Sequence, residues 1–311
     1  MRVVIVGAGL SGLVAARSLV ASGADVVVVD KGRSPGGRLA TRRIGTATLD
    51  HGAQFFTVRT PAFQRQVDDW MRRDLVRVWT NGFADDDGHP RYTATTGMNS
   101  LAKDLATGLD VRCSTMAFSV RPRDTGWEVA IDDGTAHAAD AVIVSTPLPQ
   151  AFALLADSAL PLDVSSMRLD YDRIIALLAT LDGVSLIPPP GGLQAPVPDL
   201  AFVADNHAKG VSASPAITVH ASPSWSEDHW DDGLDELREA LIELVEPWLG
   251  RARVLEAQVK KWRFAAPRSP WPDPCWIAEG GSVVLCGDAF DGPRVEGAHN
   301  SGLAAAHALT G

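Results

Sequence analysis

The 311-residue sequence has few cysteines, no basic excess and no long apolar run, and each shortage excludes a class of protein. Cys113, Cys275 and Cys286 are too few and too scattered for a disulfide framework or a zinc site, which indicates a reducing compartment. A net charge of −10 argues against a nucleic-acid partner, because such binding requires a basic face that neutralises phosphates. No apolar run reaches membrane length, and the first residues lack the apolar region and cleavage site of a signal peptide. We therefore expect a cytoplasmic protein with neither a membrane nor a nucleic-acid partner.

Metal and nucleophile motifs are missing as well. The eight histidines show no metal-ligand spacing, and no residue pattern resembles a nucleophile with its base, so we expect no metal. With 46% hydrophobic residues, the chain can bury ample core, and its length suggests about two domains.

The first thirty residues carry a dinucleotide-binding pattern. RVVIV is a short, β-branched strand of the kind buried in a parallel sheet, and Gly7, Gly9 and Gly12 follow in G-x-G-x-x-G spacing. A helical pattern comes next, then a second apolar strand that ends on Asp30. Gly7 allows the tight turn, Gly9 lets a pyrophosphate approach the backbone at the positive helix end, and Asp30 can accept hydrogen bonds from ribose hydroxyls. A lone glycine motif is weak, but this one has both strands and the acid in place.

The next two motifs are SPGGRLATRR at residues 34–43 and LDHGAQFF at 49–56. In these motifs the chain resembles the flavin-containing amine oxidase superfamily. The resemblance implies a bound FAD, with Arg38 near the pyrophosphate, Gly36 and Gly37 giving backbone access, and residues 52–55 beside the isoalloxazine ring. We expect the FAD to be held noncovalently, because the sequence places no obvious Cys or His anchor beside the ring's methyl edge. Arg42 and Arg43 fit an exposed surface pair better than a cofactor role. The expected cofactor contacts of these segments are Gly7, Gly9, Leu10, Ser11, Gly12, Asp30, Lys31, Gly37, Arg38, Leu39, Gly52, Ala53, Gln54 and Phe55.

The C-terminal segment predicts the rest of the cofactor site. SVVLCGDAF reads as a buried strand followed by Gly287 and Asp288, and VEGAHNSGLAAAHAL as a helix after it. By resemblance, Asp288 binds the ribityl chain, and Glu296, Gly297 and Ala298 lie at the ring edge, where a positive helix end stabilises charge on the reduced flavin. Met116 is a backbone-contact candidate for the adenine, and residues 139–147 form another buried strand.

The remaining residues predict a second, mainly antiparallel module. Residues 61–76 form a helix that packs through Phe63, Val67, Trp70 and Met71, and residues 231–250 form one that packs through Leu234, Leu237, Leu241, Leu244 and Trp248. The fold class is α/β with antiparallel β: a Rossmann-type FAD-binding domain with an inserted α+β substrate domain, as in amine oxidases and p-hydroxybenzoate hydroxylase. We assign residues 1–55, 96–147 and 277–311 to the FAD-binding domain, and residues 56–95 and 148–276 to the substrate domain.

The segment VKKWRFAAPR concentrates positive charge in an acidic chain. Period two places Lys260, Trp262 and Phe264 on one strand face, and Lys261 and Arg263 on the other. Two interpretations are open for Trp262 and Phe264, core packing or substrate contact. The candidate substrate-facing residues are Gln54, Trp262 and Phe264, and the candidate cations for an anionic substrate are Lys260, Lys261, Arg263 and Arg268.

Over its whole length the chain is most similar to the renalase branch of this superfamily, through the motifs above together with TTGMNSLAKDLA, KKWRFA and CGDAFDGPRVEGAHNSG. Phe264 stands where members of that branch often have Tyr or His. The resemblance implies oxidation of isomeric dihydronicotinamides, the 2- and 6-dihydro forms of NAD(P), to NAD(P)⁺, with a hydride passing to flavin N5 and molecular oxygen becoming hydrogen peroxide. Rearomatisation of the pyridine drives hydride loss, so positioning matters more than a strong base.

Three other functions stay open. An amine oxidase commonly flanks its flavin with two tyrosines, and this chain has only Tyr92 and Tyr171. A small desaturase acting on long lipids would need a deep apolar tunnel. A flavin-bound sensor without turnover would belong to another class, and the kinetics of flavin reduction and reoxidation would distinguish it from an enzyme.

Overall fold

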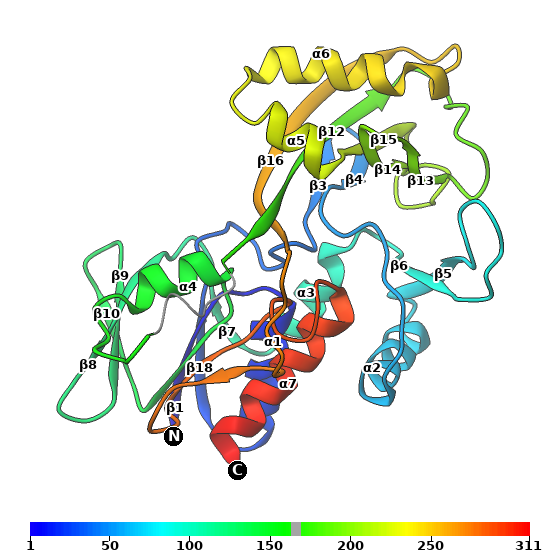
Figure 1. Cartoon of the computed structure of the whole chain (residues 1–311). Helices are drawn as coiled ribbons and strands as arrows, with labels where there is room; N and C mark the ends of the chain where they lie inside the picture. Colours follow the sequence, from blue (N-terminus) through cyan, green and yellow to red (C-terminus); the bar gives the residue numbers. More distant parts are fainter. Residues whose placement is uncertain (163–168) are drawn as a thin grey trace. The chain divides into compact units, whose positions relative to one another are not determined.

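The computed structural model describes residues 1–162 and 169–311 and forms two compact units (Figure 1). Unit 1 comprises Met1–Gly37, Leu101–Asp170 and Ala266–Gly311, and unit 2 comprises Arg38–Ser100 and Tyr171–Ala265. The predicted boundary after residue 55 falls at residue 37 in this division, and the one after residue 147 falls at residue 170. Residues 163–168, part of the predicted substrate domain, lie outside the described residues.

Unit 1 contains a six-stranded sheet in the order β17-β18-β11-β1-β2-β7 and a three-stranded sheet β10-β9-β8. Its strands are β1 (Arg2–Val6), β2 (Asp25–Val29), β7 (Asp110–Arg112), β8 (Ala117–Pro122), β9 (Trp127–Ile131), β10 (Ala136–Ala139), β11 (Ala141–Val144), β17 (Trp276–Ile277) and β18 (Val283–Leu285). Its helices are α1 (Leu10–Ala21), α3 (Asn99–Ala106), which begins in unit 2, α4 (Leu148–Leu155) and α7 (Val295–Thr310).

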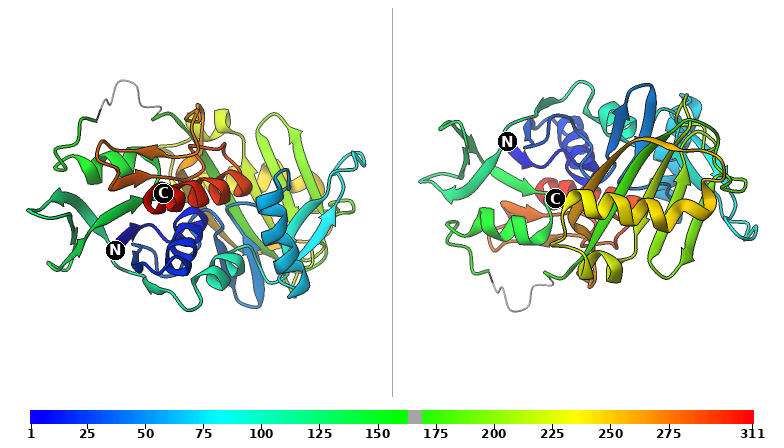
Figure 2. Two further views of the ribbon diagram at one scale, coloured as in Figure 1. Left: turned by 90° about the horizontal axis from the view of Figure 1, so that it is seen from below. Right: turned by 90° about the horizontal axis from the view of Figure 1, so that it is seen from above.

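The central strands of the larger sheet are parallel, as their uniformly apolar sequences predict. β1 pairs in parallel with β2 and β11, and β11 with β18, whereas β17 is an antiparallel edge. Helices α1 and α7 pack against each other (Figure 2). A Cβ at Gly302 would lie 2.3 Å from the Ser11 carbonyl oxygen, so the close approach of the two helices requires glycine there.

Unit 2 contains a five-stranded sheet in the order β13-β14-β15-β12-β16 and two hairpins, β3-β4 and β5-β6. Its strands are β3 (Thr41–Ile44), β4 (Ala47–Asp50), β5 (Val76–Thr80), β6 (Arg91–Ala94), β12 (Tyr171–Leu181), β13 (Gly192–Val197), β14 (Leu200–Asp205), β15 (Ala216–Ala221) and β16 (Val254–Pro267), which ends in unit 1. Its helices are α2 (Pro61–Arg72), α5 (Pro223–Asp228), α6 (Leu234–Val245) and the 3₁₀ helix η2 (Glu246–Trp248). The pairs β13-β14, β14-β15 and β15-β12 are all antiparallel, which confirms the predicted sheet type.

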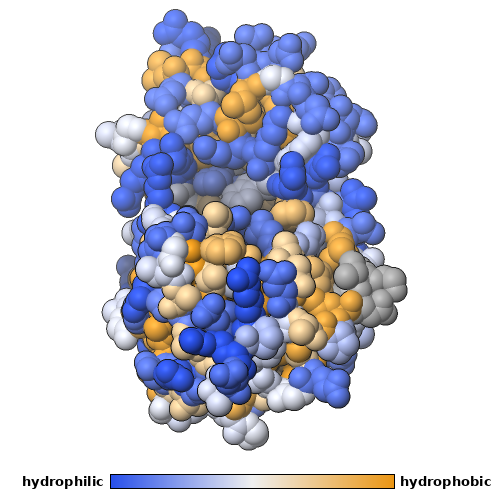
Figure 3. Space-filling view, turned by 90° about the vertical axis from the view of Figure 1, so that its left-hand side faces the viewer, coloured by the Kyte–Doolittle hydropathy of each residue, from blue (hydrophilic) through white to orange (hydrophobic). Residues whose placement is uncertain are grey.

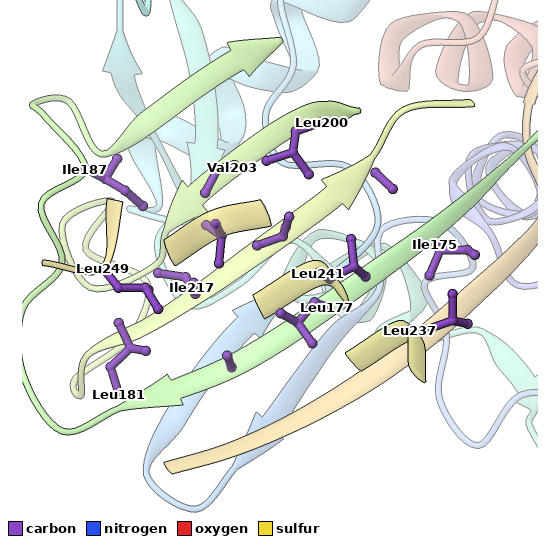
Figure 4. Packing of buried hydrophobic residues seen from close by; sticks show 14 of the residues in the cluster. Ile175, Leu177, Leu181, Ile187, Leu200, Val203, Ile217, Leu237, Leu241 and Leu249 are labelled. Carbon is purple, nitrogen blue, oxygen red and sulfur yellow. The ribbon is translucent and has the colours of Figure 1, made fainter. Parts of the chain in front are cut away.

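The core of unit 2 follows the two-residue period of its strands. Ile175 and Leu177 of β12 face Leu237 and Leu241 of α6, which lies across one face of the sheet (Figure 4). Leu178 points to the opposite face and packs against the β3-β4 hairpin. Both faces of the sheet are therefore covered within this unit.

The prediction that Met71 and Leu234 pack in the core is wrong. Met71 is 41% exposed at the end of α2, and Leu234 is 60% exposed at the start of α6. Met71 lies in the last turn of α2 and Leu234 in the first turn of α6. Val245 of α6 is fully buried instead.

Hydrophilic residues make up most of the face shown in Figure 3. Within residues 1–162 and 169–311, no helix combines the length and the apolar composition that a membrane crossing requires.

Candidate functional site

The glycine loop of unit 1 turns tightly between β1 and α1. Gly7 has φ +113°, and its N–H donates to the Val29 carbonyl at 2.8 Å. A Cβ at Gly12 would lie 2.1 Å from the Gly7 carbonyl oxygen, so that position must be glycine for the loop to close. A Cβ at Gly9, in contrast, would meet no heavy atom within 4 Å. The protein itself therefore does not require glycine at position 9, which suits a ligand that approaches the backbone there.

The N-terminus of α1 is open to an anion. Gly9 is its N-cap residue, and no side chain among the described residues caps this helix end. Leu10 and Ser11, two of the predicted cofactor contacts, lie in the first turn, with their amides at the positive end of the helix. Backbone amides and a helix dipole together suit a phosphate group.

Asp30 connects the glycine loop to the segment after β2. Its carboxylate accepts from the Ala8 N–H at 2.7 Å and from the Gly32 N–H at 2.6 Å. An ionised carboxylate can accept about four hydrogen bonds, which leaves capacity for two ribose hydroxyls. Lys31 is exposed, with its Nζ 3.5 Å from Gln150 Oε1. Gly37 has φ +52°, and a Cβ built on it would lie 3.4 Å from the Gly9 Cα.

The C-terminal candidates lie between β18 and the first turn of α7. Asp288 is half-buried, whereas Glu296 is only 2% exposed. A Cβ at Gly297 would lie 2.2 Å from the Gly292 carbonyl oxygen, so the chain folds closely over this turn. The Ala298 N–H donates to the Arg294 carbonyl, and no side chain of the described residues caps α7. The N-termini of α1 and α7 thus both lack a side-chain cap among the described residues, and both helices were predicted from sequence.

Met116 differs from the other candidates. Its side chain is 44% exposed, its N–H donates to Asp132 Oδ1 at 3.2 Å, and its carbonyl accepts from the Asp132 N–H at 2.9 Å. Both of its backbone groups are engaged within the protein, and its role at the adenine stays a prediction.

Unit 2 brings together two predicted segments that are separate in sequence. The Ala53 N–H donates to the Arg38 carbonyl at 2.9 Å, and a Cβ at Gly52 would lie 2.0 Å from the same oxygen. The Arg38 guanidinium lies 3.4 Å from the carbonyl oxygens of Phe264 and Ala265 in β16. Leu39 is 4% exposed. The cofactor roles of these residues stay predictions.

A buried ion pair beneath this loop is absent from the sequence predictions. Lys209 and Asp50 have fully buried side chains, and Lys209 Nζ lies 3.0 Å from Asp50 Oδ2. Asp50 Oδ1 accepts from the Thr41 hydroxyl at 2.6 Å and from the Met98 N–H at 2.7 Å. Burial lowers the pKa of Lys209, and the charge of Asp50 opposes this effect. The ion pair and its hydrogen bonds thus join three chain segments: the β3-β4 hairpin, the turn at Met98 and the segment at Lys209.

Gln54 is attached to the same centre. Its backbone carbonyl accepts from Lys209 Nζ at 2.6 Å, and its Nε2 donates to the carbonyls of Asp50 at 2.7 Å and Gly52 at 3.2 Å. The residue is 5% exposed, and its Oε1 is buried without a partner among the described residues.

His51 and Trp262 form a second contact in this region. The rings stack with centroids 5.4 Å apart, and Trp262 Nε1 donates to the His51 carbonyl at 2.8 Å. Burial, followed by the charges of His220 and Lys260, lowers the pKa of His51 to about 4. Burial likewise lowers the pKa of His220, whose Nε2 lies 3.2 Å from the His51 carbonyl, to about 4. Both imidazoles are neutral at pH 7, and neither is suited to accept a proton there.

The four predicted cations have different surroundings and do not form one group. Lys261 Nζ contacts the carbonyls of Trp230 and Asp232, whereas the charge of Lys260 reaches His51 on the other strand face. Arg263 is exposed, and Arg268 belongs to unit 1. Phe264 packs edge-on against Tyr171 at 5.6 Å. Of the four cations, Lys260 is the one on the Trp262 face.

Four aromatic rings also cluster in unit 2. Phe55, Trp79, Phe83 and Phe202 contact one another with centroids 5.0–6.4 Å apart. Lys209 Nζ lies 5.0 Å from the Trp79 ring centroid. Among these four residues, only Phe55 was selected from sequence, because the others lie in separate strands and a hairpin. No group of three or more His, Cys, Asp or Glu residues in the described ranges could hold a metal ion.

The sequence matches two family models. Residues 5–73 match an NAD(P)-binding Rossmann-like domain, and residues 73–310 match the flavin-containing amine oxidoreductase family. Renalase of Mus musculus is 28% identical over 171 residues, 50% of this chain and 50% of that protein. Hydroxyneurosporene desaturase of Rubrivivax gelatinosus is 47% identical over 58 residues, 19% of this chain and 11% of that protein. The chain therefore spans half or less of the length of these curated relatives.

Solved structures share the fold. A putrescine oxidase with bound putrescine has a TM-score of 0.70 at 16% identity, covering 100% of this chain and 99% of that one. This identity establishes the fold alone. It agrees with the predicted combination of a Rossmann-type domain and an amine-oxidase-type domain.

Proposed function

The chain belongs to the family of flavin-containing amine oxidoreductases, and from this premise we propose that it is an FAD-dependent oxidase of isomeric dihydronicotinamides. The substrates are the 2- and 6-dihydro forms of NAD(P), which are isomers of NAD(P)H, and the product is NAD(P)⁺. FAD, when bound, supplies the hydride acceptor and passes the electrons to molecular oxygen, which becomes hydrogen peroxide. The substrate class rests on the renalase-like motifs and on the similarity to mouse renalase.

The residues of unit 1 fit FAD. The first turn of α1 would hold the pyrophosphate, and Asp30 the ribose. Asp288 would bind the ribityl chain, and the first turn of α7 would stabilise negative charge at the ring edge. This assignment rests on the open space beside Gly9. A Cβ added there would meet no heavy atom within 4 Å, although the surrounding loop is tightly closed.

The residues of unit 2 fit a substrate that needs orientation rather than a base. His51 and His220 are neutral at pH 7, and Lys209 is ion-paired. A dihydronicotinamide loses its hydride as the ring becomes aromatic, so no residue has to remove a proton from carbon. Trp262, with Lys260 on the same face, is our candidate for contact with this anionic dinucleotide.

The two tyrosines do not support an amine oxidase. Tyr92 stacks on Phe56 and is 9% exposed, and Tyr171 is 8% exposed, which disfavours a tyrosine pair for amine substrates.

Anaerobic stopped-flow reduction tests the substrate class. We expect 2- or 6-dihydro-NAD(P) to bleach the flavin rapidly, and simple amines such as putrescine to do so slowly or not at all. Fast reduction by an amine without any response to the dihydronicotinamides would overturn the proposal in favour of an amine oxidase. Absence of turnover with every reductant would favour the flavin-bound sensor.

Asp30→Ala is expected to weaken FAD binding about 10- to 100-fold, because charge-assisted hydrogen bonds to ribose are lost. Titration of the apoprotein with FAD measures this effect. Asp140→Ala is the matched control, since Asp140 accepts from the Arg2 N–H at the opposite end of β1. Wild-type affinity in the Asp30 variant would place the ribose elsewhere.

A further inference from the structure

The side-chain amide of Gln54 has a fixed orientation. Its nitrogen donates to the carbonyl oxygens of Asp50 and Gly52, at 2.7 and 3.2 Å. A flipped amide would place Oε1 against both of these oxygens, which is repulsive, so the network itself determines which atom is the nitrogen. Gln54 therefore presents its oxygen, an obligate acceptor, on the side away from the loop.

The main chain of Gln54 is fixed by the buried charges. Lys209 Nζ donates to the Gln54 carbonyl at 2.6 Å while it pairs with Asp50 at 3.0 Å. Because the side chain and the main chain of Gln54 are both bound to the Asp50 region, the residue cannot turn to find another donor without breaking these hydrogen bonds.

Gln54 Oε1, the acceptor held in this way, has no donor among the described residues. Gln54 is 5% exposed, and Oε1 is buried without a hydrogen-bond partner among the described residues. Buried polar atoms are almost always paired, so an unpartnered oxygen on a rigidly held amide points to a ligand or an internal water as its donor. His51 Nδ1 is also buried without a partner in the described ranges, but a neutral imidazole nitrogen can donate or accept and so selects no particular group.

The charges around Gln54 favour a neutral donor. Lys209 lies directly behind its backbone, and the negative charge of Asp50 is already paired with that lysine. A protonated amine would approach the ammonium group of Lys209 and would have to compete with it for the carboxylate of Asp50, whereas a carboxamide N–H carries no net charge. A dihydronicotinamide carries one carboxamide, on the ring that loses the hydride.

We propose that Gln54 Oε1 accepts a hydrogen bond from the carboxamide N–H of the dihydronicotinamide and that Gln54 is thereby a specificity-determining residue for the substrate ring. This inference rests on the proposed function and deepens it. The hydrogen bond would orient the ring that donates the hydride, through an acceptor held in place before the substrate arrives.

The test compares two substrates in two proteins. The first substrate is 6-dihydro-NAD, and the second is its 3-acetylpyridine analogue, in which a methyl ketone replaces the amide and removes the N–H. The ratio of their kred/Kd values, measured by anaerobic stopped flow, does not depend on the fraction of active protein. Between wild type and Gln54→Met this ratio should fall about 5- to 150-fold, the range expected when a buried acceptor loses its donor. Gln64→Met, on the exposed side of α2, is the matched control and should leave the ratio unchanged.

The outcomes separate the two proposals. Reduction of wild type by both substrates, with the same ratio in Gln54→Met, would overturn the role of Gln54 and leave the proposed function standing. An equal loss with both substrates, together with a shifted flavin midpoint potential, would assign the oxygen to the flavin and would also overturn this inference. Failure of 2-dihydro-NAD(P) and 6-dihydro-NAD(P) alike to reduce wild type would refute the proposed function, and with it this inference.

Discussion

Lys209→Met is expected to lower the free energy of unfolding by about 3–5 kcal/mol, because it leaves the carboxylate of Asp50 buried without its counter-charge. Asp50 would retain the Thr41 hydroxyl and the Met98 N–H, but neither carries a positive charge. Urea denaturation followed by tryptophan fluorescence measures the change, since most of the nine tryptophans lie in unit 2.

Two comparisons sharpen this test. Arg253→Met breaks a salt bridge to Asp182 in which the arginine is 84% exposed, and it should cost no more than about 1 kcal/mol. The double variant Asp50→Asn/Lys209→Met removes both charges and should regain part of the lost stability. If Lys209→Met proved as mild as Arg253→Met, the ion pair would not be an organising element of unit 2.

The second large effect is expected at the glycine loop of unit 1, where two neighbouring substitutions should differ in kind. In Gly12→Ala the new Cβ would lie 2.1 Å from the Gly7 carbonyl oxygen, so the loop must deform. We expect an apoprotein destabilised by about 1–3 kcal/mol. We also expect it to purify without FAD. In Gly9→Ala the new Cβ meets no protein atom within 4 Å, so the apoprotein should keep its stability and lose FAD affinity alone.

Thermal unfolding of the apoproteins and FAD titration measure these two properties separately. Flavin released from wild type by heat or acid should be FAD, in keeping with noncovalent binding. Full FAD affinity in Gly9→Ala would show that the cofactor does not approach the backbone at this residue.

The parts of the fold that depend on local pattern were predictable. A β-branched run followed by glycines and a helical period specifies β1, its turn and α1 within about twenty residues. The strand predicted within residues 139–147 is present as β11, and the strand predicted before Gly287 is present as β18. Periodicity also identified α2 and α6, but it could not show that Met71 and Leu234 face solvent, because the neighbours of a terminal turn come from distant segments.

The buried network of unit 2 was not predictable in the same way. Asp50 lies within a recognised motif, yet its partner is 159 residues away in a short polar segment after β14. A lysine between Ala208 and Gly210 has no local feature that distinguishes it from an exposed one. The approach of Lys209 to Asp50 depends on the pairing of β14 and β15 and on the packing of β15 against β4, and one sequence does not reveal such long-range contacts.

The order of the strands in unit 1 has a consequence for the chain as it leaves the ribosome. β1 lies between β2, which is adjacent in sequence, and β11, which begins at Ala141, and the sheet is extended by β18 only at Val283. At about 5–20 residues per second, β1 waits roughly 7–27 s for β11 to be synthesised. α7, which packs against α1, is synthesised after the other described elements of unit 1. The nascent chain therefore carries an apolar strand edge and an uncovered helix through most of its synthesis, and C-terminal truncation would leave both exposed to aggregation.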